Sequence, residues 1–218
     1  MLKVDFHSHT IYSKDSLTSI TDLIKAARRR GLDRIVVTDH NCLQGAILAR
    51  AAAPDLVIIG EEVQTTEGEF LAAYVTEEVP RGLEPLQALR RLREQGAFVS
   101  ISHPFDPRRS GWTLERLEQL APLVDAIEVG NARVLKSEEN GRAQAFARRM
   151  HLAGNAGSDG HHPSEIGRMH TVLPEFHDAA GLREAIKSAR VQGRISHPAV
   201  HLFSTWARIV KKMRVENR

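Results

Sequence analysis

Short apolar runs alternate with stretches of helical period along most of this 218-residue chain. The alternation occurs at least five times, and it is typical of βα units built around a mostly parallel sheet. We therefore expect an α/β fold. The expected strands are residues 4–10, 34–40, 56–60, 97–102, 126–130 and 152–157, and the expected helices are residues 19–30, 43–53, 83–95, 114–120 and 137–150.

Two parts of the chain depart from this alternation. Only about seven residues separate the strand at 56–60 from the apolar run at 70–75, which is too few for a helical crossover, so we expect 70–75 to return antiparallel. Beyond the last βα unit the pattern predicts two helices, at 179–192 and 203–214. We expect one domain over residues 1–218, with a short helical extension from about residue 179 to residue 218.

Polar side chains that can bind metal ions follow nearly every expected strand. His7 and His9 are two residues apart, so an extended chain places both on one face. One such pair is weak evidence, because about 0.5 His-x-His pairs arise by chance in a chain with 11 histidines. Closed α/β barrels build their sites at the C-terminal ends of their strands, so the whole set is expected to converge. The set is His7, His9, Asp15, His40, Glu62, His103, Asp159 and His161.

The composition of this set predicts a metal centre. Any one of the side chains could have an ordinary hydrogen-bonding role, but five histidines and three carboxylates on one rim exceed what a core tolerates unless they coordinate something. Mixed imidazole and carboxylate ligation favours Zn, Mn or Fe over Ca or Mg, and the lack of cysteine ligands argues against a purely structural zinc site. Carboxylates can bridge metals, so more than one ion is expected.

Overall composition restricts the class of protein. A hydrophobic content of 42% suits one globular domain, and the formal net charge of +3 favours anionic ligands without requiring nucleic acid. An ordinary solvated surface explains that charge equally well. Cys42 is the single cysteine, so no intrachain disulfide is possible and a reducing cytoplasm is the expected compartment. No apolar run approaches the roughly 18 residues of a membrane span, so we expect a soluble protein without a signal peptide.

Five short motifs occur in order along residues 2–173, and together they resemble the successive motifs of the polymerase and histidinol phosphatase (PHP) family. The resemblance implies a distorted (β/α)7 barrel that holds two to three divalent metal ions, Zn, Mn or Fe, at the C-terminal ends of its strands and hydrolyses phosphoesters. The motifs are His7-Ser8-His9-Thr10 with Ser13 and Asp15, Thr38-Asp39-His40, Gly60-Glu61-Glu62, Ser102-His103-Pro104 and Gly157-Ser158-Asp159-Gly160-His161.

The resemblance also divides the ligands among three metals. Glu62 is preferred over Glu61 as the bridging carboxylate, because family members place this residue two positions after the glycine. The first metal would take His7, His9, Glu62 and Asp159, the second would share Glu62 with His103, and the third would take Asp15, His40 and His161.

Three departures from the family pattern bear on the metals and the substrate. Asn131 stands where members often have histidine or cysteine, and its amide oxygen is a poorer ligand, so we expect Asn131 to bind the second metal weakly. Asp15 stands where some members use histidine, which shifts the third site toward harder ions such as Mn. The helical insertion that some small phosphoesterase members carry after the second motif is absent, so their substrate class does not transfer to this chain.

Residues on the loops after the strands are candidates for catalysis and substrate binding. Three ligand carboxylates facing up to three divalent cations leave a positive pocket that attracts an anion. His162 could protonate the leaving group or support the neighbouring ligand. Arg108, Arg109, Arg133 and Arg168 lie on rim loops, where a guanidinium group can grip a phosphate. The predicted catalytic set is Glu62, Asp159, His162, Arg108 and Arg168.

One motif of the expected site occurs a second time in the sequence, outside the pattern of strands. Ile195-Ser196-His197-Pro198 copies Ile101-Ser102-His103-Pro104, but only the earlier copy follows a clear apolar strand. We therefore interpret His197 as a loop residue outside the site. No role in the site is expected for His151, His177 and His201, while His170 lies with Arg168 on a rim loop.

The sequence therefore predicts a metal-dependent hydrolase of phosphoric esters (EC 3.1 type). Its substrate would be a small phosphorylated metabolite or a short nucleotide, attacked by a metal-activated hydroxide. One alternative is hydrolysis of a non-phosphate ester or amide. The other is a non-catalytic accessory metal-binding module that docks nucleic acid through the basic C-terminal helix. We expect no membrane association, and no protein partner is evident.

Overall fold

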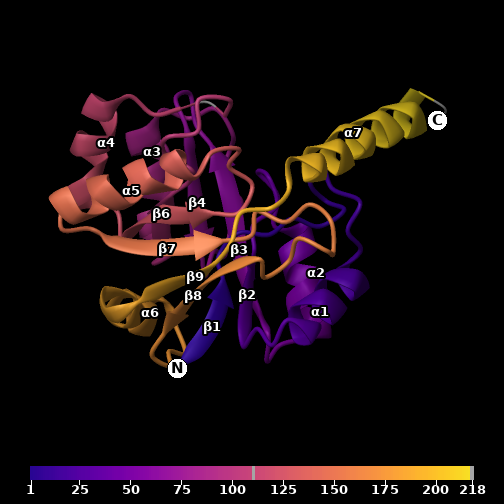
Figure 1. The fold of residues 1–218 in the computed structure, drawn as a ribbon, viewed down its shortest axis with the longest axis horizontal. Helices are drawn as coiled ribbons and strands as arrows, with labels where there is room; N and C mark the ends of the chain where they lie inside the picture. The colour runs from indigo at the N-terminus through magenta and orange to yellow at the C-terminus, as the bar shows by residue number, and fades with distance from the viewer. Residues whose placement is uncertain (110, 217–218) are drawn as a thin grey trace.

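The sheet wraps into a nearly closed barrel (Figure 1). The computed structural model describes residues 1–109 and 111–216, and its strands lie in the order β7-β6-β5-β4-β3-β2-β1-β8-β9. The strands are β1 (Leu2–Asp5), β2 (Arg34–Val37), β3 (Val57–Gln64), β4 (Glu69–Ala73), β5 (Phe98–Ile101), β6 (Ala126–Asn131), β7 (Ala153–Gly157), β8 (Met169–Leu173) and β9 (Arg190–Gly193).

Hydrogen bonds between the N-terminal segment and the segment around β7 close the barrel. Phe6 donates its backbone N–H to the carbonyl of Ala156 (3.3 Å), and Ser8 forms a parallel bridge with Gly160. Strands β1 to β7 therefore form the wall, while β8 and β9 continue the sheet from β1. The antiparallel direction of β4 against both β3 and β5 distorts the barrel and confirms the return predicted at residues 70–75.

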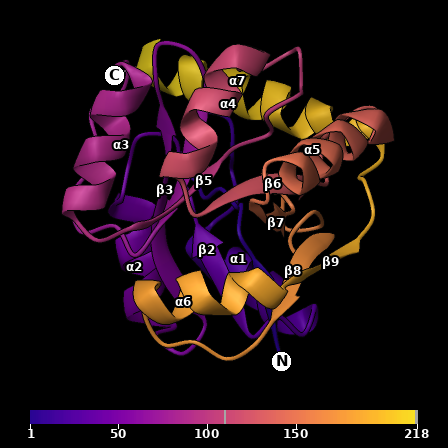
Figure 2. The ribbon, with the colours of Figure 1, turned by 90° about the vertical axis from the view of Figure 1, so that its left-hand side faces the viewer.

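Helices cover the outer surface of this wall, as Figure 2 shows. The predicted helix start at Ser19 is confirmed, because the Ser19 hydroxyl accepts a hydrogen bond from the N–H of Asp22. None of the helices in the described part of the chain has both the length and the apolar character needed to cross a bilayer. The helices are α1 (Ile20–Arg29), α2 (Gln44–Ala52), α3 (Pro85–Glu94), α4 (Leu114–Leu120), α5 (Ser137–Arg149), α6 (Ala179–Ala185) and α7 (His201–Glu216).

Apolar side chains fill the end of the barrel at which β1 begins. The rings of Phe6 and Phe98 lie with their centroids 6.1 Å apart. Both belong to one buried cluster with Leu182 of α6 and with Ile186, which follows α6. Since this end is closed by apolar packing, the polar side chains that follow the strands gather at the opposite, C-terminal end.

The prediction of a single helix over residues 179–192 was wrong. Helix α6 stops at Ala185, and Arg190–Gly193 forms strand β9, which pairs antiparallel with β8. Val191 is the single large apolar side chain of β9, and the other three residues are exposed. A strand this short and this polar gives no alternating pattern, so its pairing with β8 decides its structure.

Adjacent glutamates of β3 point to opposite faces of the sheet, as the strand period requires. Glu62 reaches the polar end of the barrel. Glu61 is fully buried, and its Oε2 accepts a hydrogen bond from the N–H of Val79 (3.1 Å). Burial raises the pKa of Glu61 to about 8, so this side chain is mostly protonated at neutral pH and is unsuited to bind a cation.

We expect the natural chain to lose folding stability as pH rises through the titration of Glu61, and we expect Glu61→Gln to remove this loss. Because the pKa of Glu61 is about 8 in the folded chain and near its ordinary value after unfolding, the unfolded chain releases the proton first as pH rises. The contribution of Glu61 to the free energy of unfolding therefore falls from about pH 4.5 to about pH 8. In urea unfolding, the advantage of the glutamine variant should grow between pH 5 and pH 8. An advantage that is the same at both pH values would contradict the raised pKa.

We expect Gly157→Ala to weaken the closure of the barrel. A Cβ at this position would lie 2.4 Å from Cβ and 2.5 Å from the backbone nitrogen of His7, so the N-terminal segment would have to move. The free energy of unfolding should fall by about 1–3 kcal/mol in urea. Gly141→Ala is the control, since open space surrounds this helical position and alanine should stabilise the helix by up to about 1 kcal/mol. Unchanged stability of Gly157→Ala would refute the tight contact at the closure.

Candidate metal centre

Two imidazoles and two carboxylates meet at the C-terminal end of the barrel. His7 Nε2 lies 3.3 Å from Glu62 Oε2 and 3.6 Å from Asp159 Oδ1. His9 Nε2 lies 3.5 Å and 3.4 Å from the same two oxygens. All four side chains are buried. They come from the segments after β1 and β7 and from β3, so the closure of the barrel brings them together.

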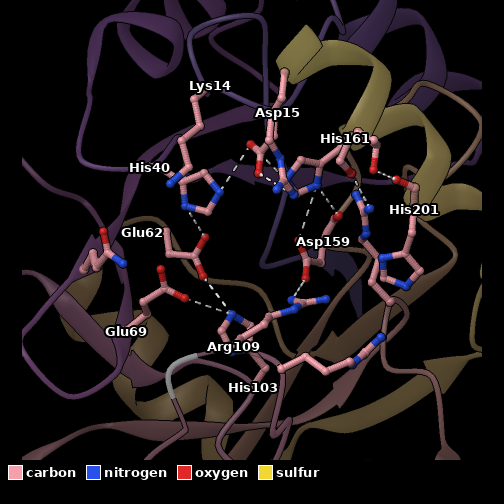
Figure 3. A pocket seen from close by; sticks show the side chains of 16 residues that line it. Lys14, Asp15, His40, Glu62, Glu69, His103, Arg109, Asp159, His161 and His201 are labelled. Carbon is pink, nitrogen blue, oxygen red and sulfur yellow. Dashed lines mark hydrogen bonds and ion pairs between the residues drawn. The ribbon is translucent and has the colours of Figure 1, made fainter.

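A second group lies beside the first. Asp15 Oδ1 is 3.5 Å from His40 Nε2 and 3.3 Å from His161 Nε2. Figure 3 shows the carboxylate of Asp15 between these two rings. The other ring nitrogen of His40, Nδ1, lies 2.9 Å from Glu62 Oε2 and connects the two groups. The carboxylate of Glu62 therefore lies between these two groups, although the resemblance implied sharing with His103 and not with His40.

A third group contains a residue that the sequence interpretation missed. His103 Nε2 lies 3.1 Å from Glu62 Oε1 and 3.3 Å from Glu69 Oε2. Glu69 is the first residue of β4, and β4 runs antiparallel to its neighbours, so its start lies at the rim where the parallel strands end. The predicted antiparallel return was the signal that could have identified Glu69.

Polar side chains behind the histidines fix their ring orientations. Glu128 Oε1 lies 3.0 Å from His7 Nδ1, and Glu128 Oε2 accepts the backbone N–H of His103 at 2.8 Å. Ser13 contacts His9 Nδ1 at 3.0 Å and donates its hydroxyl to Asp39 at 2.6 Å. With Nδ1 engaged, the Nε2 atoms of His7 and His9 point toward the carboxylates. The sequence interpretation also missed Glu128, although an acidic residue within an apolar strand was a signal that could have identified it.

Four buried atoms of the centre form no well-aligned hydrogen bond with any described residue, although they lie within ion-pair distance of one another or of neighbouring ligands. They are His7 Nε2, His9 Nε2, Asp15 Oδ1 and Glu62 Oε2. Leaving such atoms buried without a partner is costly, and together they form the nitrogen and oxygen donor set of a borderline divalent metal. Three sets also offer ligand atoms within 4.8 Å of one another. They are His9, His40 and His161; His7, His9 and Asp159; and His40, Glu62 and Glu69. The residues present therefore fit divalent metal ions.

The charges of the centre keep its carboxylates ionised. Burial raises the pKa of Glu62, but the charge of His7 and other imidazoles outweighs burial and holds this pKa well below its usual range. Burial likewise raises the pKa of Asp159, but Arg109 and His7 hold it well below the usual range. Burial and neighbouring imidazoles lower the pKa of His9. Burial also lowers the pKa values of His7, His40 and His103, but carboxylates such as Glu62 outweigh burial and raise all three. The ionised carboxylates are in the form that binds metals, whereas a metal ion would have to displace the protons of these three rings.

Asn131 reaches the centre as a hydrogen-bond donor. Its Nδ2 donates to Glu128 Oε2 at 3.1 Å and to Asp159 Oδ2 at 3.0 Å. Its Oδ1 accepts the backbone N–H of Arg133 at 2.8 Å. In this arrangement the amide orients two carboxylates, whereas the sequence interpretation expected its oxygen to bind the second metal.

A cavity of about 300 Å³ opens over the metal centre. Arg109 lines it and donates from Nη1 to the carboxylate of Asp159. Arg108 also lines it, but Asp106 holds its guanidinium group through two hydrogen bonds of 3.1 and 2.9 Å. Helix α7 forms one wall with side chains from successive turns, namely His201, Ser204, Thr205 and Arg208. The basic side chains of the lining are Lys14, Arg108, Arg109, Arg133 and Arg208.

Two predicted catalytic residues lie away from this cavity. Among the described residues that line it, neither His162 nor Arg168 occurs. The ring of His162 stacks on Phe203, with centroids 4.1 Å apart and planes at 15°. The backbone carbonyl of Arg168 accepts the N–H of Arg194 at the end of the β8–β9 hairpin. Their position on the chain after a ligand motif did not determine the direction of their side chains.

The other histidines divide between the cavity and the surface. His201, to which the sequence interpretation gave no role, lines the cavity, and burial together with the charges of Arg133 and Arg109 lowers its pKa to about 4. His201 is therefore neutral at pH 7. His197 lies at the start of a short 3-10 turn, where its Nδ1 accepts the N–H of Ala199 at 3.2 Å. That placement agrees with its interpretation as a loop residue.

Comparisons with solved structures show the same fold. A two-domain protein from Bacteroides vulgatus, described as containing a predicted PHP-like metal-dependent phosphoesterase, superposes with a TM-score of 0.73 at 24% identity. The match covers 94% of this chain and 69% of that chain. The lesion-specific endonuclease PfuEndoQ from Pyrococcus furiosus superposes with a TM-score of 0.62 at 17% identity, over 87% of this chain and 57% of that one.

Comparisons of sequence give the family. An uncharacterized protein of Methanocaldococcus jannaschii is 36% identical over 179 residues, which cover 80% of this chain and 72% of that protein. A model of the PHP domain matches residues 5–78, which contain the first three motifs, and a PHP-associated model matches residues 137–191. The motifs occur in the expected order, and the barrel gathers their side chains into one donor set at its rim. Together with the sequence matches, this shows that the chain belongs to the PHP family.

Proposed function

We propose that this protein is a metal-dependent phosphoesterase that acts on a small phosphorylated metabolite or a short nucleotide. The observation that carries the proposal is the set of buried donor atoms without hydrogen-bond partners, placed at the floor of a cavity with basic walls. A cavity of about 300 Å³ suits a ligand of metabolite or mononucleotide size.

The donor set would hold two to three divalent ions, Zn, Mn or Fe. Glu62 would be shared among them, because its two carboxylate oxygens face separate groups of histidines. Asp159 would contribute to the group with His7 and His9, and Asp15 to the group with His40 and His161. Asn131 would orient Asp159 from behind. The chemistry expected from divalent ions at such a site is Lewis-acid activation of water and of a phosphoryl oxygen.

The walls supply the groups that would bind the anionic part of the substrate. Arg109 lies beside Asp159 at the floor, so its guanidinium group can reach a phosphoryl group bound there. Arg133 is 3% exposed, and its Nη1 has no hydrogen-bond partner among the described residues. Its Nε lies 3.6 Å from Glu165 Oε2, so the unused Nη1 donor is the part of this group that can bind an anion. The neutral ring of His201 can hydrogen-bond the remainder of the substrate without adding charge.

A phosphodiester substrate has one observation in its favour. A second groove of about 370 Å³, lined by Lys14, Arg208, Lys211 and Lys212, shares two of these residues with the main cavity. A basic surface that continues from the cavity could follow the backbone of a short oligonucleotide. Turnover of short oligonucleotides and of phosphomonoesters, compared at equal concentration, separates the two substrate classes. Turnover of carboxyl esters or amides alone would instead support the hydrolase alternative.

We expect Glu62→Gln to lower turnover of a phosphoester panel by at least about 100-fold, because it removes the shared ligand charge. Elemental analysis should find two to three divalent ions per natural chain and fewer in the variant. His197→Ala is the matched control, since its ring lies in an exposed turn, and its turnover and metal content should stay unchanged. Circular dichroism checks that both variants fold. Absence of bound metal in the natural chain, or equal losses in both variants, would overturn the proposal.

We expect Arg109→Ala to raise the KM for a phosphoester by about 10- to 100-fold, because it removes a charge-assisted hydrogen bond to the substrate. Arg168→Ala provides the comparison, since Arg168 does not belong to the described lining of the cavity. Its KM should remain within about 2-fold of the natural value. A larger effect of Arg168→Ala than of Arg109→Ala would show that the substrate does not bind in this cavity.

A further inference from the structure

Helix α7 is amphipathic in the opposite sense to an ordinary surface helix. Its polar residues face the protein, where Ser204 is 3% exposed and Arg208 lines the cavity. A surface helix normally buries its apolar stripe and exposes its polar face. The large apolar side chains of α7 are instead exposed, namely Leu202 by 68%, Phe203 by 40%, Trp206 by 56%, Ile209 by 46% and Met213 by 45%.

Contacts with the barrel fix α7 in this orientation. Ala207 is 1% exposed, the Nζ of Lys211 donates to the carbonyls of Ile11 and Ser13, and Arg133 donates to the hydroxyl of Ser204. Turning the apolar face inward would break these contacts. Figure 1 shows α7 as the outermost element on its side, with its C-terminal half extending beyond the barrel. The apolar face is therefore accessible to another molecule.

The spacing of the exposed side chains identifies the kind of partner. Leu202, Trp206, Ile209 and Met213 are separated by four, three and four residues, which is the a/d spacing of a heptad repeat. At about 100° per residue, these four side chains fall within about 60° of the helix circumference. Phe203 lies about 60° beyond this arc, where its ring stacks on His162 of the same chain. A helix that lies on a membrane or a broad protein surface uses a wider apolar stripe, of about 100° or more. A narrow seam fits another helix with the same spacing.

We propose that the seam pairs antiparallel with α7 of a second copy of this chain, forming a dimer with twofold symmetry. With the symmetry axis between Ala207 and Arg208, Leu202 of one protomer faces Met213 of its partner, and Trp206 faces Ile209. Each contact then occurs twice, as a closed twofold interface requires. The same four side chains serve both protomers, so no second complementary surface is needed.

The charges of α7 favour the antiparallel arrangement over the parallel one. Its arginines and lysines all lie in the C-terminal half, so parallel pairing would bring the two basic halves together. They are Arg208, Lys211, Lys212 and Arg214. Antiparallel pairing separates them and also opposes the two helix dipoles. Beside the seam, antiparallel pairing places Lys212 of one protomer opposite Thr205 of its partner. The flanking positions of the seam therefore bring no two cations together.

Analytical ultracentrifugation of the full chain tests the proposal. The natural chain should sediment as a concentration-dependent dimer of twice its 24.3 kDa mass. Trp206→Glu should raise the dimer dissociation constant by at least about 30-fold, as loss of a central aromatic anchor does. Leu202→Glu is a second, independent variant of the seam. Ile47→Glu is the matched control, because Ile47 is a 45% exposed apolar residue on α2, and the dimer should remain.

Disulfide cross-linking tests the direction of pairing. In a Cys42→Ser background, chains carrying Phe203→Cys should cross-link to chains carrying Val210→Cys, because antiparallel pairing places these positions side by side. A natural chain that is monomeric at every concentration would overturn the proposal, and so would a dimer that both seam variants leave intact. Binding of monomeric protein to vesicles of phosphatidylglycerol and phosphatidylcholine, lost in Trp206→Glu, would overturn it as well and assign the face to a membrane.

Discussion

The burial of the Glu62 carboxylate among histidines is the constraint on which the centre depends. Its oxygens lie 3.3 Å from His7, 3.5 Å from His9, 2.9 Å from His40 and 3.1 Å from His103, and the side chain is 1% exposed. These four histidines come from three separate segments of the chain. The barrel must therefore close correctly before the centre exists, and the centre in turn needs cations to compensate its buried donor atoms.

The convergence of the ligands could be predicted because parallel strands share a direction. His40 and Asp159 each follow a parallel strand, and such strands end at one rim, so order along the chain was enough to bring them together. Glu69 follows a different rule, because β4 runs antiparallel and contributes its first residue to that rim. The sequence indicated the reversal of β4, but only the register of the sheet places the carboxylate of Glu69 next to His103.

The substrate side of the cavity was less predictable, since neighbouring arginines on one loop look equivalent in sequence. The structure distinguishes them by their partners: Asp106 holds Arg108, while Arg109 reaches Asp159. The position of His201 in the cavity could not be predicted from the sequence either. This residue belongs to a helix that docks across the rim, and nothing in the period of that helix identifies which face meets the barrel. Tertiary packing, which a hydrophobic pattern does not encode, decides both cases.

Helix α7 connects the cavity to the proposed dimer because its two faces serve different surfaces. One face lines the cavity with His201 and Arg208, and the other carries the seam around Trp206. Pairing of two such helices would add contacts that hold the cavity wall in place, beyond the bonds that Lys211 already makes to the barrel. Ligand binding and dimerisation would both require the docked helix. The two equilibria would then be linked by mass action, so that each would raise the affinity of the other. The inverted amphipathicity of α7 would then be explained, since its polar face would bind substrate and its apolar face would bind the partner.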